Sequence, residues 1–245
     1  MLSRFRQKRP GTPLGQMLFY EIIRRSVRIL FGVIYRLRVR GLEHLPPTGA
    51  VLIVANHQSF LDPPAIGSAV GVRHLDFVAR LGLFQSSRAF GWLIHTLNSV
   101  PIKEEGGDAA AIKEILRRLD AGRAVLIFPE GSRSEDGAME PFKRGVAVLV
   151  KRAKCPVMPA AVEGCFDAWP RHQKRPRLTG ARIAVAFGEP IGHDELMKDG
   201  ADAALTRLSS EVDRMRLGLR QELRRASNGR FPPAGAADRA LIPAG

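Results

Sequence analysis

The sequence predicts an α/β fold, a single domain in which a central, mostly parallel or mixed sheet is covered by helices. Short apolar runs alternate with longer helical patterns from about residue 41 onward, which is typical of this class. The runs are apolar throughout rather than at every second position, so we expect both faces of the sheet to be buried. With 245 residues, 45% of them hydrophobic, the chain can form one core of ordinary size.

Six strands are expected, at residues 50–55, 74–79, 99–102, 124–128, 156–162 and 182–187. Helices are expected at residues 63–70, 88–97, 108–119, 142–153 and 194–225, the last with a break near Gly200. The folded domain should therefore span residues 41–225. Residues 226–245 are rich in Gly, Pro and Ala and lack apolar periodicity, which predicts a disordered tail.

The cysteine and histidine positions do not indicate a metal site or a disulfide framework. Cys155 and Cys165 stand ten residues apart without a CxxC pair, and the six histidines are scattered. We therefore expect no metal and no redox cofactor, and a reducing cytosolic setting is favoured.

Positive charge is concentrated at the amino terminus. The formal net charge is +14, and ten basic residues against the single acid Glu21 place +9 of it in the first forty positions. Such a block indicates a polyanion, either nucleic acid or an anionic membrane, or else a solubilising tail.

Apolar residues alternate with arginines over residues 14–35, which favours an interfacial helix or helix pair. Uncharged stretches in this segment, such as residues 29–35, are far shorter than the ~20 residues of a transmembrane helix. We predict that residues 1–40 form a basic amphipathic segment anchored to an anionic membrane surface, with no nucleic-acid partner.

His57 and Asp62 lie in the loop after the first long strand, five positions apart. A continuous helix would place them about 500° apart, so only a turning loop brings them together. The carboxylate would then hold one imidazole nitrogen and leave the other to take a proton. The alternative is a backbone-bonded loop histidine beside an aspartate that caps the helix starting at Pro63. The chain has no GxSxG elbow, so the pair suits activation of a substrate hydroxyl.

A second loop, residues 128–134, follows the fourth strand and reads FPEGSRS. Gly131 permits backbone conformations closed to other residues. Hydroxyl and cationic donors that suit a phosphate gather in and after this loop, on Ser132, Arg133, Lys143 and Arg144. The alternative is a turn whose charges are solvated, with Glu130 paired to Arg133.

Four sequence blocks occur in a characteristic order: HQSFLD, VPIK, FPEGSRS and CPVMPAAVEG. Together they resemble the blocks of the glycerolipid acyltransferase superfamily, the 1-acylglycerol-3-phosphate O-acyltransferases, from about residue 41 to residue 190. The resemblance implies transfer of a fatty acyl group from acyl-CoA or acyl carrier protein to the sn-2 hydroxyl of a lysophospholipid, first of all lysophosphatidic acid, giving phosphatidic acid in phospholipid biosynthesis.

The resemblance also implies roles for individual residues. His57 matches the general base of the family and Asp62 the carboxylate that orients it. The acceptor-binding positions of the family fall on Glu130, Gly131 and Arg133, and Lys143 lies where a basic residue often completes that site. We expect Ser132, from its own hydroxyl, and Lys103 to bind the acceptor as well.

The second block departs from the family pattern. An arginine usually follows its short strand, and in this chain Glu104 occupies that position. Lys103 is the residue left to reach the same phosphate, and the alternative is that it is a solvated charge. A lysolipid with another head group, including an amino-acid-containing one, therefore stays a candidate acceptor.

We expect both substrates to bind together, with His57 taking the proton of the acceptor hydroxyl and no acyl-enzyme formed. We expect peripheral or monotopic attachment to the cytoplasmic face of the cell membrane. Two other functions stay open: a non-catalytic basic module that binds lipid or nucleic acid, and hydrolysis of a thioester or lysolipid.

Overall fold

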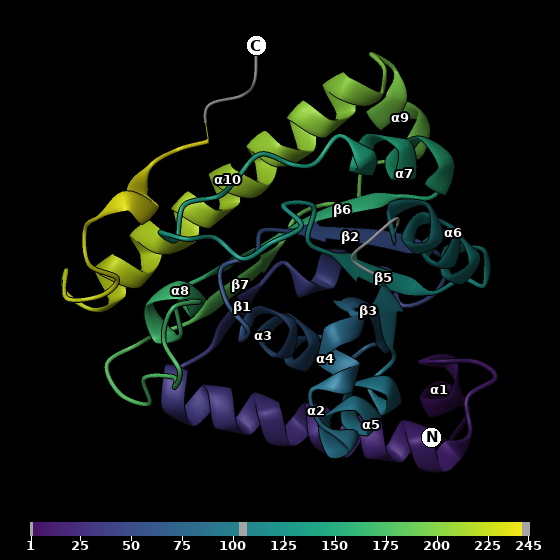
Figure 1. The fold of residues 1–245 in the computed structure, drawn as a ribbon, viewed down its shortest axis with the longest axis horizontal. Helices are drawn as coiled ribbons and strands as arrows, with labels where there is room; N and C mark the ends of the chain where they lie inside the picture. Colours follow the sequence, from purple (N-terminus) through teal and green to yellow (C-terminus); the bar gives the residue numbers. More distant parts are fainter. Residues whose placement is uncertain (1, 103–106, 242–245) are drawn as a thin grey trace.

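The computed structural model describes residues 2–102 and 107–241, in which a mixed seven-stranded sheet lies between two layers of helices (Figure 1). The strands are β1 (Arg38–Arg40), β2 (Val51–Ala55), β3 (Leu75–Arg80), β4 (Ser99–Ile102), β5 (Ala124–Ile127), β6 (Val157–Glu163) and β7 (Ala184–Phe187). Their order across the sheet is β1-β7-β6-β2-β5-β3-β4. Neighbouring strands in this order are parallel, except that β6 and β7 are antiparallel.

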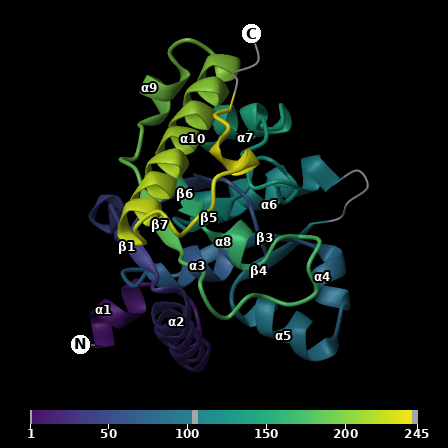
Figure 2. The same cartoon turned by 90° about the vertical axis from the view of Figure 1, so that its left-hand side faces the viewer.

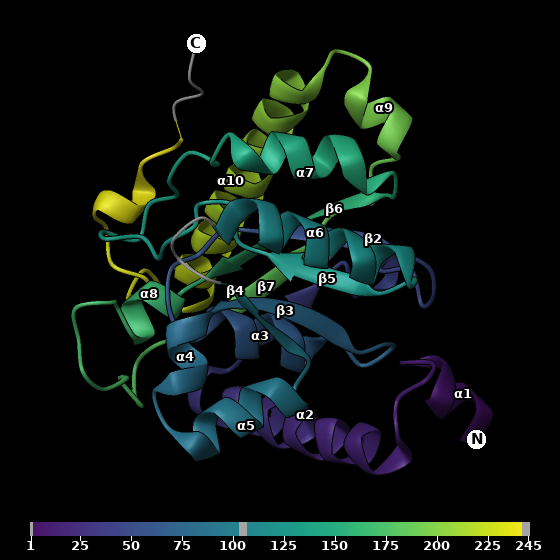
Figure 3. The same cartoon turned by 45° about the vertical axis from the view of Figure 1, so that its right-hand side comes forward.

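The helices are α1 (Leu2–Gln7), α2 (Leu14–Tyr35), α3 (Asp62–Ala69), α4 (Leu81–Gln85), α5 (Arg88–Thr96), α6 (Gly107–Asp120), α7 (Gly145–Ala153), α8 (Cys165–Ala168), α9 (His193–Met197) and α10 (Ala201–Ala226). In Figures 1 and 3, α2 and α3 cover one face of the sheet, while α6, α7 and α10 cover the other. Both faces are therefore buried, as the continuous apolar strands predict.

Strand side chains alternate between two hydrophobic cores. Ile53 and Leu126 point toward α2 and α3, where they join a cluster that includes Ile66. Leu52 and Val125 point the other way and join the cluster beneath α6, α7 and α10. These strand residues are at most 1% exposed, so the central strands contribute both of their faces to hydrophobic stabilisation.

The connections between strands open a crevice between β2 and β5. The chain leaves β2 toward α3 on one face of the sheet and leaves β5 toward α7 on the other. Because neighbouring parallel strands are followed by helices on opposite faces, their loops diverge at the carboxyl ends. The two loops that carry the sequence motifs border this crevice. Helix α8, which follows β6 at the same edge, faces the viewer in Figure 2.

The six predicted strands are confirmed within two residues of their bounds, as is the break near Gly200 that separates α9 from α10. Strand β1 was not expected, because two of its three residues are exposed arginines and only Val39 is apolar. The helix predicted at 142–153 begins later, at Gly145, since the Lys143 amide donates to the carbonyl of Pro129 instead of entering a helical turn.

The amino-terminal segment forms the expected helix over residues 14–35, and several of its cations are part of the fold. Lys8 and Arg24 both pair with the buried Glu21 at 2.8 Å, and Arg9 pairs with the buried Asp76. The basic block is thus only partly available to an external polyanion. Among the described helices, none has the combination of length and apolar character that a membrane crossing requires.

The carboxyl-terminal segment differs from the expected disordered tail. Residues 227–241, which we call the tail segment, lie along α10 in Figures 1 and 2 and include a buried alanine, Ala237. Their main-chain carbonyls accept hydrogen bonds from arginines of α10, such as Arg216 to Ala237 at 2.6 Å. Composition missed this because the contacts use the backbone of the segment, which has no apolar pattern of its own. Residues 242–245 are outside the described part.

Candidate active site

His57 and Asp62 lie together in the loop that follows β2. Asn56 extends the sheet by one more pairing, since its side-chain amide exchanges hydrogen bonds of 2.9 Å with the backbone of Val162 on β6. The chain then turns, so that Nδ1 of His57 comes within 2.8 Å of Oδ2 of Asp62. Asp62 is fully buried, whereas the His57 side chain is 19% exposed. The pairing that the spacing left open is therefore formed.

The Asp62 carboxylate holds the loop as well as the imidazole. Its Oδ2 accepts hydrogen bonds from the backbone amides of Gln58 at 2.6 Å and Ser59 at 2.7 Å. The expectation that Asp62 caps α3 is wrong, because α3 includes Asp62 and its carboxylate faces back toward residues 57–59. These contacts fix the carboxylate in the position from which it holds the His57 ring.

Glu130 joins the two motif loops from behind. Its Oε1 accepts from the backbone amide of His57 at 2.6 Å, and its Oε2 accepts from the amide of Glu140 at 3.0 Å. The amide of Ser134 donates to the His57 carbonyl at 2.8 Å, which adds a second link. Burial raises the pKa of Glu130 to about 8. Glu130 is absent from the lining of the cleft described below, so its carboxyl serves the loops.

Arg133 carries an unsatisfied donor at the mouth of the site. Its guanidinium lies 3.5 Å from the centre of the Phe60 ring, and its Nη1 is buried without a hydrogen-bond partner among the described residues. Burial, and then the neighbouring Arg171, lower its pKa. A buried cationic donor without a partner is costly, and an anionic ligand would satisfy it.

Gly131 makes room for Lys143. Its φ of +71° lies in the left-handed region, which favours glycine. A Cβ on Gly131 would lie 2.6 Å from Nζ of Lys143, so the lysine stem occupies the space that a side chain would fill. The glycine therefore allows the turn after β5 and also the close approach of a cation to it.

A cleft of about 730 Å³ extends from these loops into the domain. Its polar lining comes from the loops after β2 and β5 and from nearby cations: His57, Gly131, Ser132, Arg133, Lys143, Arg80 and Arg171. Its apolar lining comes from β3 to β5, α6 and α7: Val78, Ile102, Ile112, Ile115, Ile127, Val146 and Leu149. The cleft thus combines a cationic mouth with an apolar interior.

The structure brings five predicted residues to this cleft and places two, Asp62 and Glu130, behind it. Lys103 and Glu104 lie outside the described residues. Sequence reasoning missed Arg80 and Arg171. Arg80 ends β3, beside the crevice, and donates to the Gly131 carbonyl at 2.9 Å. That strand-end position is a signal that could have found it, whereas Arg171 lies in an irregular loop with no comparable pattern.

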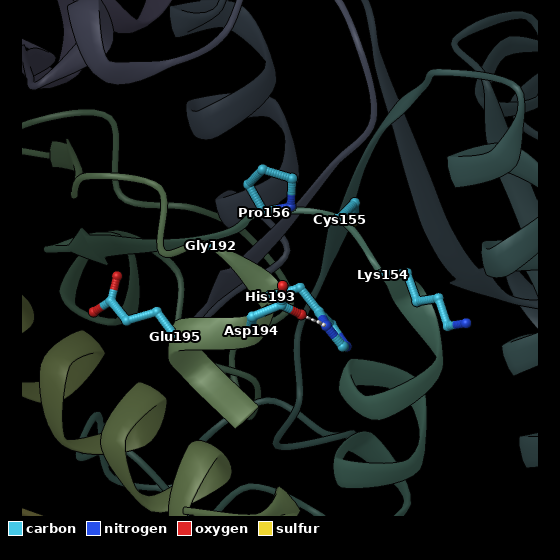
Figure 4. Close-up of a pocket in the computed structure, with 7 residues that line it drawn as sticks. All are labelled: Lys154, Cys155, Pro156, Gly192, His193, Asp194 and Glu195. Atoms are coloured by element: carbon cyan, nitrogen blue, oxygen red, sulfur yellow. Dashed lines mark hydrogen bonds and ion pairs between the residues drawn. The ribbon is translucent and has the colours of Figure 1, made fainter. Parts of the chain in front are cut away.

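A second His–Asp pair, His193 and Asp194, lies in a separate hollow beside Lys154 and Cys155 (Figure 4). Nδ1 of His193 is 3.2 Å from the Asp194 carboxylate, and its Nε2 is 3.1 Å from the carbonyl of Lys151. Both ring nitrogens therefore have protein partners, and the Asp194 side chain is fully exposed. This pair lacks a nitrogen that is left to take a proton from a substrate.

Neither cysteine offers a thiolate. Burial raises the pKa of Cys155 to about 11, and burial together with the Asp62 carboxylate raises the pKa of the fully buried Cys165 well above its ordinary value. Within the described residues there is also no group of three or more histidines, cysteines or carboxylates placed to hold a metal ion.

The family model described as Acyltransferase matches residues 36–163, more than half of the chain. The chain belongs to this acyltransferase family. The matched region begins before β1 and ends with β6, so it includes His57, Asp62 and the loop around Arg133.

Two relatives and a solved structure that are similar to this chain are also named acyltransferases. The Bos taurus 1-acyl-sn-glycerol-3-phosphate acyltransferase alpha is 27% identical over 199 residues, 81% of this chain and 68% of the relative. The Streptococcus pneumoniae 1-acyl-sn-glycerol-3-phosphate acyltransferase is 27% identical over 214 residues, covering 82% and 74%. The crystal structure of the Thermotoga maritima 1-acyl-sn-glycerophosphate acyltransferase PlsC is 25% identical, with a TM-score of 0.70 over 83% of this chain and 80% of that one.

Glu130 makes the stability of the acyltransferase depend on pH. Its pKa is about 8 in the folded protein against 4.5 ordinarily, so over this range the unfolded chain has released a proton that the folded chain retains. Rising pH therefore favours unfolding. In Glu130→Gln this contribution is removed, and we expect the unfolding free energy of the variant, relative to the native protein, to rise between about pH 5 and pH 8. Urea denaturation of both proteins and of the exposed control Glu43→Gln measures it, and a difference independent of pH would contradict the raised pKa.

Proposed function

We propose that this acyltransferase transfers a fatty acyl group from a thioester to the sn-2 hydroxyl of lysophosphatidic acid, giving phosphatidic acid. The observation that carries the proposal is the buried Asp62 carboxylate holding Nδ1 of His57, while His57 itself lines a cleft with a cationic mouth. Relatives named for the same reaction support it.

The reaction follows from the free nitrogen of the imidazole. With Nδ1 held by Asp62, Nε2 of His57 takes the proton of the acceptor hydroxyl as the oxygen attacks the thioester carbonyl. The tetrahedral intermediate then expels the thiolate, which receives that proton from His57 and leaves as a thiol. Asp62 stabilises the imidazolium between the two steps. Because neither cysteine is ionised and no serine elbow is present, the acyl group passes directly between substrates.

The acceptor phosphate belongs at the mouth of the cleft. Arg133 supplies a buried Nη1 without a partner in the described chain, and Arg80, Arg171 and Lys143 line the same opening. Guanidinium forks suit phosphate oxygens. These cations can hold a phosphate monoester without an arginine at the position of Glu104. We therefore propose lysophosphatidic acid, rather than an amino-acid-containing lysolipid, as the acceptor.

The apolar interior of the cleft suits a fatty acyl chain. Each methylene that moves from water to such a surface gains ~0.8 kcal/mol, which makes a long chain a strong anchor. The isoleucines of α6 and β5, Ile112, Ile115 and Ile127, lie on this route. The thioester carrier is coenzyme A or acyl carrier protein.

An exposed apolar face supports attachment of the enzyme to a membrane surface. On α2, Ile22, Ile29 and Val33 are 61%, 67% and 76% exposed, and on the adjacent α5 Trp92 is 61% exposed. Figures 1 and 3 show the two helices side by side on the outside of the molecule. The ring centres of Phe19 on α2 and Trp92 on α5 are 5.3 Å apart. Apolar patches of this kind mark interaction surfaces. We propose peripheral attachment to the cytoplasmic leaflet through this face.

Removal of the general base should abolish the reaction. We expect His57→Ala to lower acyl transfer to lysophosphatidic acid by about 10²–10⁴-fold, because proton transfer then falls to water. The assay follows phosphatidic acid formed from either thioester donor, with His193→Ala as the matched histidine control at near-native rate. Equal activity of the two variants, or release of free fatty acid at the same rate with and without acceptor, would refute the proposal.

The phosphate contact should appear in the affinity for the acceptor. We expect Arg133→Ala to raise the KM for lysophosphatidic acid by about 10- to 100-fold, the equivalent of one lost charge-assisted hydrogen-bond pair. Transfer to a monoacylglycerol, which lacks the phosphate, should be unaffected, as should the exposed control Arg152→Ala on α7 with either acceptor. A native preference for an amino-acid-containing lysolipid in the same panel would overturn the choice of acceptor.

Attachment should depend on the apolar face of α2. We expect Val33→Glu to reduce cosedimentation with vesicles that contain phosphatidylglycerol by about tenfold or more, since a charge replaces a side chain inserted among lipids. The control Val148→Glu changes an exposed valine on α7, on the opposite layer, and should sediment like the native protein. Native protein that stays in the supernatant at physiological salt would rule out this surface.

A further inference from the structure

The tail segment, residues 227–241, is fixed to α10 by arginine side chains. Arg216 donates to the carbonyls of Ala237 at 2.6 Å and Arg239 at 2.9 Å, and Arg220 donates to the carbonyl of Pro233 at 2.7 Å. These arginines are at most 2% exposed. Buried cations need partners, and in this protein the backbone of the tail segment supplies many of them.

The Arg220 guanidinium connects the tail segment with the sheet, and Arg216 lies 3.7 Å from the same strand residue, Glu163. Nη1 of Arg220 donates to Oε1 of Glu163 at 2.7 Å, and its Nε donates to Oδ1 of Asp238 at 2.8 Å. Glu163 is the last residue of β6 and is fully buried, whereas Asp238 belongs to the tail segment. A planar fork makes both contacts at once, which a flexible ammonium group does not reproduce.

The catalytic loop meets this network through the side chain of Gln58. Its Nε2 donates to Oε2 of Glu163 at 3.0 Å and to the carbonyl of Gly137 at 2.8 Å. The tail segment supports both acceptors: Arg220 ties it to Glu163, and Ala237 packs against Gly137, where an added Cβ would lie 2.9 Å from that of Ala237. Gln58 is itself buried, so its amide has a fixed position.

The backbone of Gln58 holds the catalytic carboxylate, because its N–H donates to Oδ2 of Asp62 at 2.6 Å. We propose that Gln58, Glu163 and Arg220 are positioning residues, through which the tail segment fixes the geometry of the His57–Asp62 pair. None of these three residues lines the cleft, so the link acts on the chemical step rather than on substrate binding. As a statement about catalysis, this inference rests on the proposed function.

The test replaces the planar guanidinium of Arg220 by an ammonium group of the same charge. In Arg220→Lys the contact with Glu163 can persist but the simultaneous contacts with Asp238 and Pro233 are lost. We expect kcat for lysophosphatidic acid to fall about tenfold with KM within about twofold. The matched control is Arg214→Lys, an exposed arginine of the same helix that pairs with Glu211, and it should behave as the native protein.

Hydrogen exchange gives a readout that does not need activity. We expect amide exchange in a peptide covering residues 56–62 to accelerate about tenfold in Arg220→Lys, while a peptide from β3 keeps its native rate. Asp238→Asn leaves Glu163 paired with Arg220 and should give the same pattern, which keeps the test decisive if the lysine variant does not fold. Unchanged exchange at 56–62, acceleration at β3 to the same extent, or an unchanged kcat would overturn the inference. If the native protein transfers no acyl group, the proposed function fails while the exchange data still decide the link.

Discussion

One carboxylate oxygen organises the candidate active site of this acyltransferase. Oδ2 of Asp62 accepts from His57 and from the amides of Gln58 and Ser59, and it does so in a fully buried position. An uncompensated charge there would cost several kcal/mol. The loop amides stabilise the buried carboxylate, and the carboxylate in turn stabilises the conformation of the loop. The same carboxylate thus fixes both the turn of the loop and the position of the His57 ring.

The sheet determines where this oxygen lies. Strands β2 and β5 are neighbours, and their following helices pack on opposite faces, so the loops after them separate and expose a crevice. Glu130 and Ser134 then join the two loops from behind through His57. The polar chemistry is thus confined to the edge of the sheet, and the apolar side chains of β3 to β5 remain available to line the interior of the cleft.

The features that could be predicted from the sequence are those that depend on residues close together along the chain. The buried strands were predicted because each is a continuous apolar run. For His57 and Asp62, the spacing within one loop allowed a pair without requiring it, and the resemblance to the acyltransferase blocks predicted their roles. Sequence reasoning placed Glu130 among the acceptor-binding residues, yet its carboxyl faces two backbone amides. That orientation depends on the packing of two loops separated by about seventy residues of sequence, as the pairing of positions 57 and 130 shows. Arg171 was missed for the same reason, since only the fold brings its loop to the cleft.

The tail segment shows the limit of composition as evidence. A stretch rich in Gly, Pro and Ala lacks apolar periodicity, and the usual inference is disorder because such a stretch cannot bury enough apolar surface. In this protein the tail segment is ordered because it stabilises α10. Arg216 and Arg220 are buried on that helix, and their N–H groups require hydrogen-bond acceptors. A backbone with small side chains can approach a helix closely enough to provide carbonyl groups. The ordering of residues 227–241 therefore depends on the arginines of α10, whose buried donors bind the carbonyls of this segment. The composition of the segment itself does not contain this information.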